Sequence, residues 1–166
     1  MTYDPNERRD TPLALTLKQR IRREGPIPVA EYMRACLHDS EHGYYRRQPA
    51  IGAAADFVTA PEISQVFGEL IGLWCAVAWQ QMGSPSRLQL VELGPGRGTM
   101  MCDALRAARV VPGFLQAIDV HLIESNVDLR AVQREALSQF GVAAQWHDEL
   151  FALSKQEAVP EGAAIV

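Results

Sequence analysis

The sequence predicts an α/β fold, with a parallel sheet covered by helices and an α-helical region before it. From residue 88 onward, short apolar segments alternate with amphipathic ones, and this β-α-β order favours a parallel sheet. Before residue 83, apolar residues recur instead at the spacing of a helix face. We therefore expect two parts, a helical region over 1–86 and the amino-terminal half of a doubly wound sheet domain over 87–166.

Three helices are predicted in the N-terminal region. The first two cover residues 13–24 and 28–39, and a long irregular stretch follows them. The third covers 60–82, and Thr59 and Glu62 have the spacing of a capping box at its start. The broad apolar face of this helix predicts burial of Phe67, Leu70, Ile71, Trp74, Val77 and Ala78.

The sheet region is predicted from its strand, helix and turn signals. Its elements are, in chain order, strand 88–93, helix 99–110, strand 120–123, helix 126–140, strand 142–146 and a strand beginning at 163. Asn126 is placed to cap the second of these helices, and Gly141 to end it. A doubly wound sheet normally continues beyond a fourth strand, so we expect the chain to be a fragment of a longer one.

A glycine-rich turn, Gly94-Pro95-Gly96-Arg97-Gly98, connects the first strand to its helix. Glycines there allow a sharp turn and bring backbone N–H groups close to a ligand. A dinucleotide fingerprint needs glycine or alanine where Thr99 stands, which disfavours an NAD-dependent oxidoreductase, and a P-loop needs a lysine that this turn lacks. The pattern Gly94-x-Gly96-x-Gly98, with Glu92 two residues before it, instead resembles motif I of class I S-adenosylmethionine (SAM) methyltransferases.

The acids at the strand ends suit SAM, which contains an ammonium and a ribose but no phosphate. Glu92 is placed to hold the ammonium, and Glu124, after the second strand, to accept hydrogen bonds from the ribose hydroxyls. Trp146, His147 and Asp148 lie at the end of the third strand, where we predict the adenine contact. A stacked adenine and an ordinary core aromatic are equally good interpretations of Trp146.

Two segments are similar to one family. Residues 55–72, which begin Ala55-Asp56-Phe57-Val58-Thr59, resemble a stretch of the MidA-like methyltransferases, and the glycine turn resembles that family's motif I. The resemblance implies a Rossmann-like class I methyltransferase sheet, incomplete in this shorter chain, with SAM as cofactor. Because the family includes the mitochondrial assembly factor of respiratory complex I, it also implies methyl transfer to a protein arginine. Asp56 and Glu62 become the candidate catalytic residues, although a capping box alone explains Glu62 equally well.

Composition disfavours several other classes of protein. The net charge of −4 argues against a nucleic-acid partner, and the longest apolar run, residues 70–79, is too short to cross a bilayer. The three cysteines have no paired spacing, so neither a disulfide nor a metal site is expected. We expect a cytoplasmic protein, without membrane insertion, whose partner is a protein substrate, by resemblance a complex I subunit. The alternative is a non-catalytic SAM-binding or assembly module, and an exposed sheet edge is a candidate surface for homo-oligomers.

Overall fold

The computed structural model describes residues 10–47, 58–150 and 164–165. The chain forms two compact units, residues 1–50 and residues 51–166. This boundary falls earlier than the division at residue 86 drawn from the sequence pattern. The physical reason is that the helix before the first strand packs against the helix that follows it, so both belong to the unit that contains the sheet.

The N-terminal unit contains three described helices, α1 (Pro12–Glu24), α2 (Val29–His38) and α3 (Tyr44–Arg47). Thr11 caps α1 by accepting a hydrogen bond from the backbone N–H of Ala14, and Gly25, at a φ of 90°, ends it. An ion pair of 2.5 Å between Arg20 and Glu31 connects α1 to α2. The two longer helices predicted for this region are therefore confirmed to within one residue at each end.

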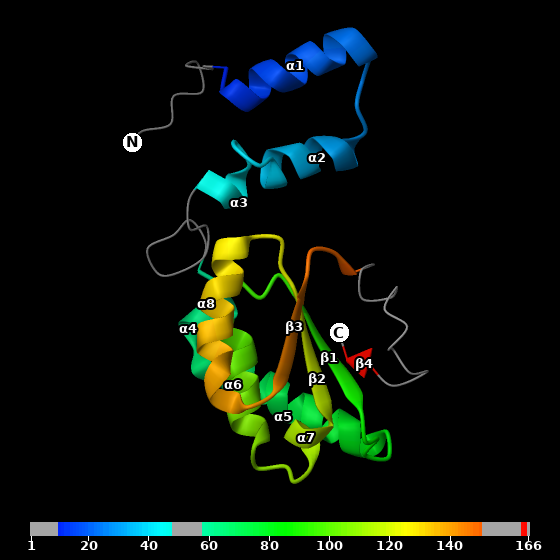
Figure 1. Ribbon diagram of the computed structural model, residues 1–166, viewed down its shortest axis with the longest axis vertical. Helices are drawn as coiled ribbons and strands as arrows, with labels where there is room; N and C mark the ends of the chain where they lie inside the picture. The colour runs from blue at the N-terminus through cyan, green and yellow to red at the C-terminus, as the bar shows by residue number, and fades with distance from the viewer. Residues whose placement is uncertain (1–9, 48–57, 151–163, 166) are drawn as a thin grey trace. The chain divides into compact units, whose positions relative to one another are not determined.

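The second unit is built on a four-stranded parallel sheet (Figure 1). Its strands are β1 (Leu88–Leu93), β2 (Ile118–Ile123), β3 (Ala143–His147) and β4 (Ala164–Ile165). Their order across the sheet is β3-β2-β1-β4. Each pair of neighbouring strands is parallel. The predicted parallel sheet is confirmed, and β1 has the predicted bounds.

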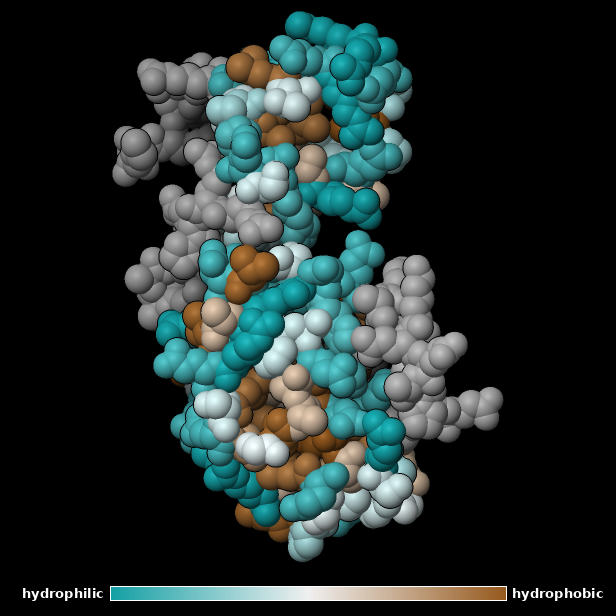
Figure 2. Space-filling model, in the orientation of Figure 1, coloured by the Kyte–Doolittle hydropathy of each residue, from teal (hydrophilic) through white to brown (hydrophobic). Residues whose placement is uncertain are grey.

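Helices pack on one face of this sheet. They are α5 (Gln65–Gln81), α6 (Thr99–Ala108), α7 (Phe114–Ala117) and α8 (Val127–Leu137), the last extended by the short helix η1 (Ser138–Phe140). The core between sheet and helices is formed by alternate strand residues and by apolar helix residues, among them Leu88, Leu90, Val120, Leu122, Leu105, Phe114 and Leu137. Figure 2 shows hydrophobic residues gathered over part of this unit, bordered by hydrophilic ones. No helix among the described residues is long and apolar enough to cross a membrane.

The segment before the sheet differs from the predicted single helix. A short helix, α4 (Ala60–Ile63), ends at Ser64, which is extended and caps α5 by accepting from the N–H of Val66. The predicted buried face of α5 is wrong, because Leu70 and Trp74 are 61% and 62% exposed. The buried residues of α5 lie on another face, at Gly68, Gly72, Cys75, Ala76 and Trp79.

Small residues explain why α5 buries that face. A Cβ added at Gly72 would lie 2.3 Å from the carbonyl oxygen of Ala104, and one at Gly68 would lie 2.6 Å from Cβ of Asp103. The backbones of α5 and α6 therefore approach so closely that only glycine fits between them. Hydropathy alone could not identify this face, since its contact depends on the absence of side chains.

Candidate functional site

The glycine turn lies at the carboxyl end of β1 and begins α6. All three of its glycines have positive φ, 64° at Gly94, 55° at Gly96 and 82° at Gly98, which other residues rarely adopt. The N–H of Gly94 donates to the carbonyl of Ile123 at the end of β2, which fixes the turn against the sheet. A Cβ added at Gly94 would meet no atom of the described residues within 4 Å, so that side of the turn is not filled by them.

Glu92 is a buried acid immediately before this turn. Its side chain lies on the same face of the sheet as Leu90, toward the helices, and is 8% exposed. Its Oε2 has no hydrogen-bond partner among the described residues. Burial raises the pKa of the Glu92 carboxyl to about 7. An unpaired buried carboxylate oxygen suits a cationic group, which would favour its ionised form.

Glu124 stands at the end of β2 on the same face. Glu92 is in register with Leu122, and Glu124 follows Leu122 by two residues, so both carboxylates lie toward the helices. One oxygen of Glu124 accepts from the N–H of Asn126 at 2.8 Å, within the loop that starts α8. Asn126 in turn caps α8, as predicted, by accepting from the N–H of Asp128.

Gln133 of α8 is a further site residue that sequence reasoning missed. Its side chain is fully buried, and its amide nitrogen donates to the carbonyl of Gly96 at 2.6 Å. The same nitrogen lies 3.5 Å from Oε2 of Glu124, and the amide oxygen accepts from the indole N–H of Trp146 at 2.8 Å. One sequence signal could have identified Gln133. It lies four residues before the apolar Leu137, which places its polar side chain on the inner face of α8.

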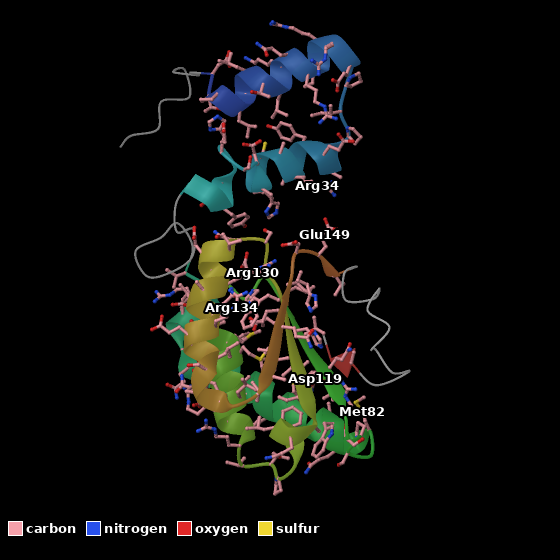
Figure 3. All side chains as sticks on the ribbon, viewed as in Figure 1. Arg34, Met82, Asp119, Arg130, Arg134 and Glu149 are labelled. Atoms are coloured by element: carbon pink, nitrogen blue, oxygen red, sulfur yellow. The ribbon has the colours of Figure 1, made fainter. Side chains whose placement is uncertain are left out.

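Trp146 packs against the core from β3. Its indole N–H is bonded to Gln133, and the Arg134 guanidinium lies 4.7 Å from the ring centroid. Figure 3 shows Arg130 and Arg134 along α8, and Arg130 donates to the backbone carbonyl of Glu124 and pairs with Asp148. These contacts support the interpretation of Trp146 as a core aromatic, while its contact with adenine stays a prediction.

His147 does not lie with the other predicted residues. It follows Trp146 on β3, so its side chain is on the opposite face of the sheet, where its Nε2 is 3.0 Å from Nδ1 of buried His121. Burial lowers the pKa of both imidazoles. Within the described part of the chain, His147 reaches the site through its backbone carbonyl, which accepts from the N–H of Glu124. Asp148, by contrast, is exposed at the tip of β3.

Glu62 lies beside the glycine turn. Its carboxylate accepts a hydrogen bond of 2.6 Å from the hydroxyl of Thr99, the first residue of α6. The predicted capping box is not formed, because the Thr59 side chain makes no capping hydrogen bond and Glu62 points to α6 instead. Thr99, which disfavours a dinucleotide site, thus holds α4 next to the turn. Asp56, the other candidate catalytic residue, lies outside the described residues.

Curated relatives match most of this chain. The mitochondrial protein arginine methyltransferase NDUFAF7 of Danio rerio is 48% identical over 74% of this chain and 29% of its own length. The mitochondrial homologue of that protein from Drosophila melanogaster is 40% identical over 93% of this chain and 38% of its own. The chain therefore spans about a third of the length of these relatives.

The cytoplasmic location expected from the sequence is contradicted by these comparisons. The relatives from Danio rerio and Drosophila melanogaster, and the human protein at 42% identity, are named as mitochondrial proteins. The expectation rested on the absence of a targeting signal near the N-terminus, and such an absence does not determine a compartment.

A solved structure and a family model match most of the sheet-containing part of this chain. A crystal structure from Burkholderia thailandensis, bound to S-adenosyl-homocysteine, superposes with a TM-score of 0.64 at 30% identity, covering 83% of this chain and 37% of that one. The family described as "Putative S-adenosyl-L-methionine-dependent methyltransferase" matches residues 70–161, more than half of the chain. The predicted class I fold and the cofactor of the family, SAM, are confirmed. The chain belongs to this family of SAM-dependent methyltransferases.

Proposed function

We propose that this chain holds SAM at the carboxyl ends of β1 and β2 and forms the cofactor-binding part of a protein arginine methyltransferase. The observation that carries the proposal is the buried Oε2 of Glu92, which has no partner among the described residues and precedes the glycine turn by two positions. A buried carboxylate without a partner is costly unless a ligand supplies one. The ammonium of the methionine group is such a partner.

Three more groups complete the cofactor site. The turn from Gly94 to Gly98 brings backbone close to the ligand without side chains in the way. Glu124 keeps lone pairs for the two ribose hydroxyls, since only one of its oxygens is strongly bonded, to Asn126. The adenine lies toward the tip of β3, where Trp146, the His147 backbone and Asp148 lie.

Bound SAM supplies a methyl group that is already activated, so the residues of this chain act by orientation and charge. Glu62 is held by Thr99 beside the turn, where its negative charge attracts a cationic substrate. We propose, from the family resemblance, that Asp56 orients the guanidinium whose nitrogen attacks the methyl group. The site then contributes positioning rather than a strong base, because the substrate proton can leave to water.

Isothermal titration of SAM into two glycine variants tests the cofactor site. Gly94 and Gly141 have nearly equal φ values, 64° and 66°, and at either position an added Cβ would meet no described atom within 4 Å. Gly94→Ala and Gly141→Ala should therefore lose similar stability, about 1 kcal/mol each. Only Gly94→Ala should weaken SAM binding, by about tenfold or more, because its methyl group enters the open side of the turn. Equal affinities in the two variants, or no binding by the wild type, would contradict the proposed site.

The proposed methyl acceptor is an arginine of a protein, by family resemblance a subunit of respiratory complex I. The relatives from Danio rerio and Drosophila melanogaster are named protein arginine methyltransferases, which supports this choice. Transfer of labelled methyl from SAM to the purified subunit, measured with this protein, tests it. Label on arginine supports the proposal, while SAM binding without transfer to any complex I subunit favours the non-catalytic module instead.

We also propose that the sheet edge allows homo-oligomers to form. In the described sheet β3 has one neighbour, β2, and Ala143 and Gln145 on it are exposed. Light scattering after size exclusion tests this, with Gln145→Lys as the variant expected to return an oligomer to monomer. A monomeric wild type at high concentration would refute it.

A further inference from the structure

The amide of Gln133 connects the carboxyl ends of three neighbouring strands. It bonds to Gly96 in the turn after β1, lies near Glu124 after β2, and bonds to Trp146 at the end of β3. A Cβ added at Gly98 would also lie 3.4 Å from Cγ of Gln133, so the side chain packs against the turn along its length. Gln133 thus bonds to one group after β1, one after β2 and one near the carboxyl end of β3.

The chemistry of these partners fixes which way the amide points. The indole N–H of Trp146 can only donate, so it requires the amide oxygen, and the Gly96 carbonyl can only accept, so it requires the amide nitrogen. The second N–H of that nitrogen is then directed to the carboxylate of Glu124. A buried donor held in one orientation between two acceptors determines their separation.

We propose that Gln133 is a positioning residue for the cofactor, which acts by holding the Gly96 carbonyl and the Glu124 carboxylate in place. The proposal rests on the proposed function, since these two groups border the site assigned to the adenosyl ribose. Affinity for the cofactor then depends on a hydrogen-bond donor at position 133, and a side chain of equal size without that donor cannot replace it.

Two variants of equal side-chain length separate donor from size. Gln133→Met removes all hydrogen bonds, and Gln133→Glu replaces the donor by an oxygen that faces Gly96 and Glu124. Titration of S-adenosylhomocysteine into the full chain at pH 8 should show a dissociation constant raised about tenfold or more in both. Gln139→Glu, an exposed position just after α8, is the matched control and should bind like the wild type.

A pH series gives a readout that a loss of packing would not reproduce. When the carboxyl introduced by Gln133→Glu is protonated, its O–H restores a donor to the Gly96 carbonyl. Among the described residues, the charged groups that face this position are Glu124 from the β2 end, and Arg130 and Arg134 from α8 itself. From pH 8 to pH 5.5, the ratio of the dissociation constant of Gln133→Glu to that of the wild type should fall at least severalfold. The same ratio for Gln133→Met should not fall.

The outcomes separate the two proposals. A wild type that binds no S-adenosylhomocysteine refutes the proposed function and this inference together. A wild type that binds, with unchanged affinity in Gln133→Met, refutes the inference alone. If Gln133→Glu does not fold at pH 8, the dissociation constant of Gln133→Met tests the inference instead. It is measured in a sample that thermal unfolding shows to be folded at the assay temperature.

Discussion

Replacing Glu92 by glutamine should stabilise this protein and weaken its cofactor site at the same time. The substitution keeps the size of the side chain and removes its charge. The Glu92 carboxyl is 8% exposed and lacks a partner for Oε2 among the described residues. The unfolded chain exposes this carboxyl to water, so only the folded state bears the cost of burying its charge.

The size of the effect follows from the pKa of Glu92, raised by burial from 4.5 to about 7. The difference corresponds to about 3 kcal/mol. Between pH 4.5 and pH 7 the unfolded chain has released this proton and the folded chain keeps it, so the contribution of Glu92 to the free energy of unfolding falls as pH rises. The loss is complete above about pH 7. Glu92→Gln should therefore gain about 3 kcal/mol relative to the wild type at pH 8 and almost nothing at pH 4.

Urea unfolding followed by tryptophan fluorescence measures this gain, because Trp74, Trp79 and Trp146 all lie in the sheet-containing unit. Glu135→Gln on the exposed side of α8 is the control and should show no comparable dependence on pH. In the same samples, SAM affinity at pH 8 should fall about tenfold to a hundredfold in Glu92→Gln, because the ammonium loses a charged partner. A variant that is no more stable than the wild type at pH 8, or that binds SAM equally well, would show that Glu92 is not the buried, ligand-directed acid described above.

Two further predictions concern stability. Gly72→Ala places a methyl group 2.3 Å from the Ala104 carbonyl oxygen, so the free energy of unfolding measured by chemical denaturation should drop by about 2 kcal/mol or more. Val77→Ala on the exposed side of α5 is the control and should change it by less than about 1 kcal/mol. Burial lowers the pKa values of His121 and His147, so the unfolded chain takes up protons first and the contribution of this pair to stability should fall as pH drops below 6.5. His121→Gln should reduce that slope below pH 6.5, and an unchanged slope would mean that the pair does not resist protonation.

Local signals in the sequence predicted the elements around the site well. β1 has the predicted bounds, Asn126 caps α8 and Gly141 ends η1. Each of these depends on residues close together in the chain, such as a cap, a glycine at positive φ or an apolar run between turn signals. The β-α-β order then places consecutive strands side by side and parallel, with the connecting helices on the sheet. For this reason Glu92 and Glu124 are expected at the ends of neighbouring strands.

Contacts between distant segments were not predictable in the same way. Hydropathy marked the wrong face of α5 as buried, because the real contact with α6 depends on Gly68 and Gly72. Glu62 had the spacing of a capping box, yet its carboxylate bonds to Thr99, 37 residues away in the chain. His147 lies with His121 on the opposite face of the sheet from Trp146, an arrangement that follows from its position on β3 once the strand is placed.

The sequence by itself determined the parallel sheet, the glycine turn and the family, because these depend on short-range patterns and on motifs of fixed spacing. Only the tertiary structure decided that Oε2 of Glu92 is buried without a partner among the described residues and that Gln133 joins three strand ends. Both are properties of a three-dimensional environment, since the partners come from distant parts of the chain, as Gly96 does for Gln133 across 37 positions. The residue type determines which hydrogen bonds a side chain can make. The tertiary structure determines whether water or protein groups are present to make them.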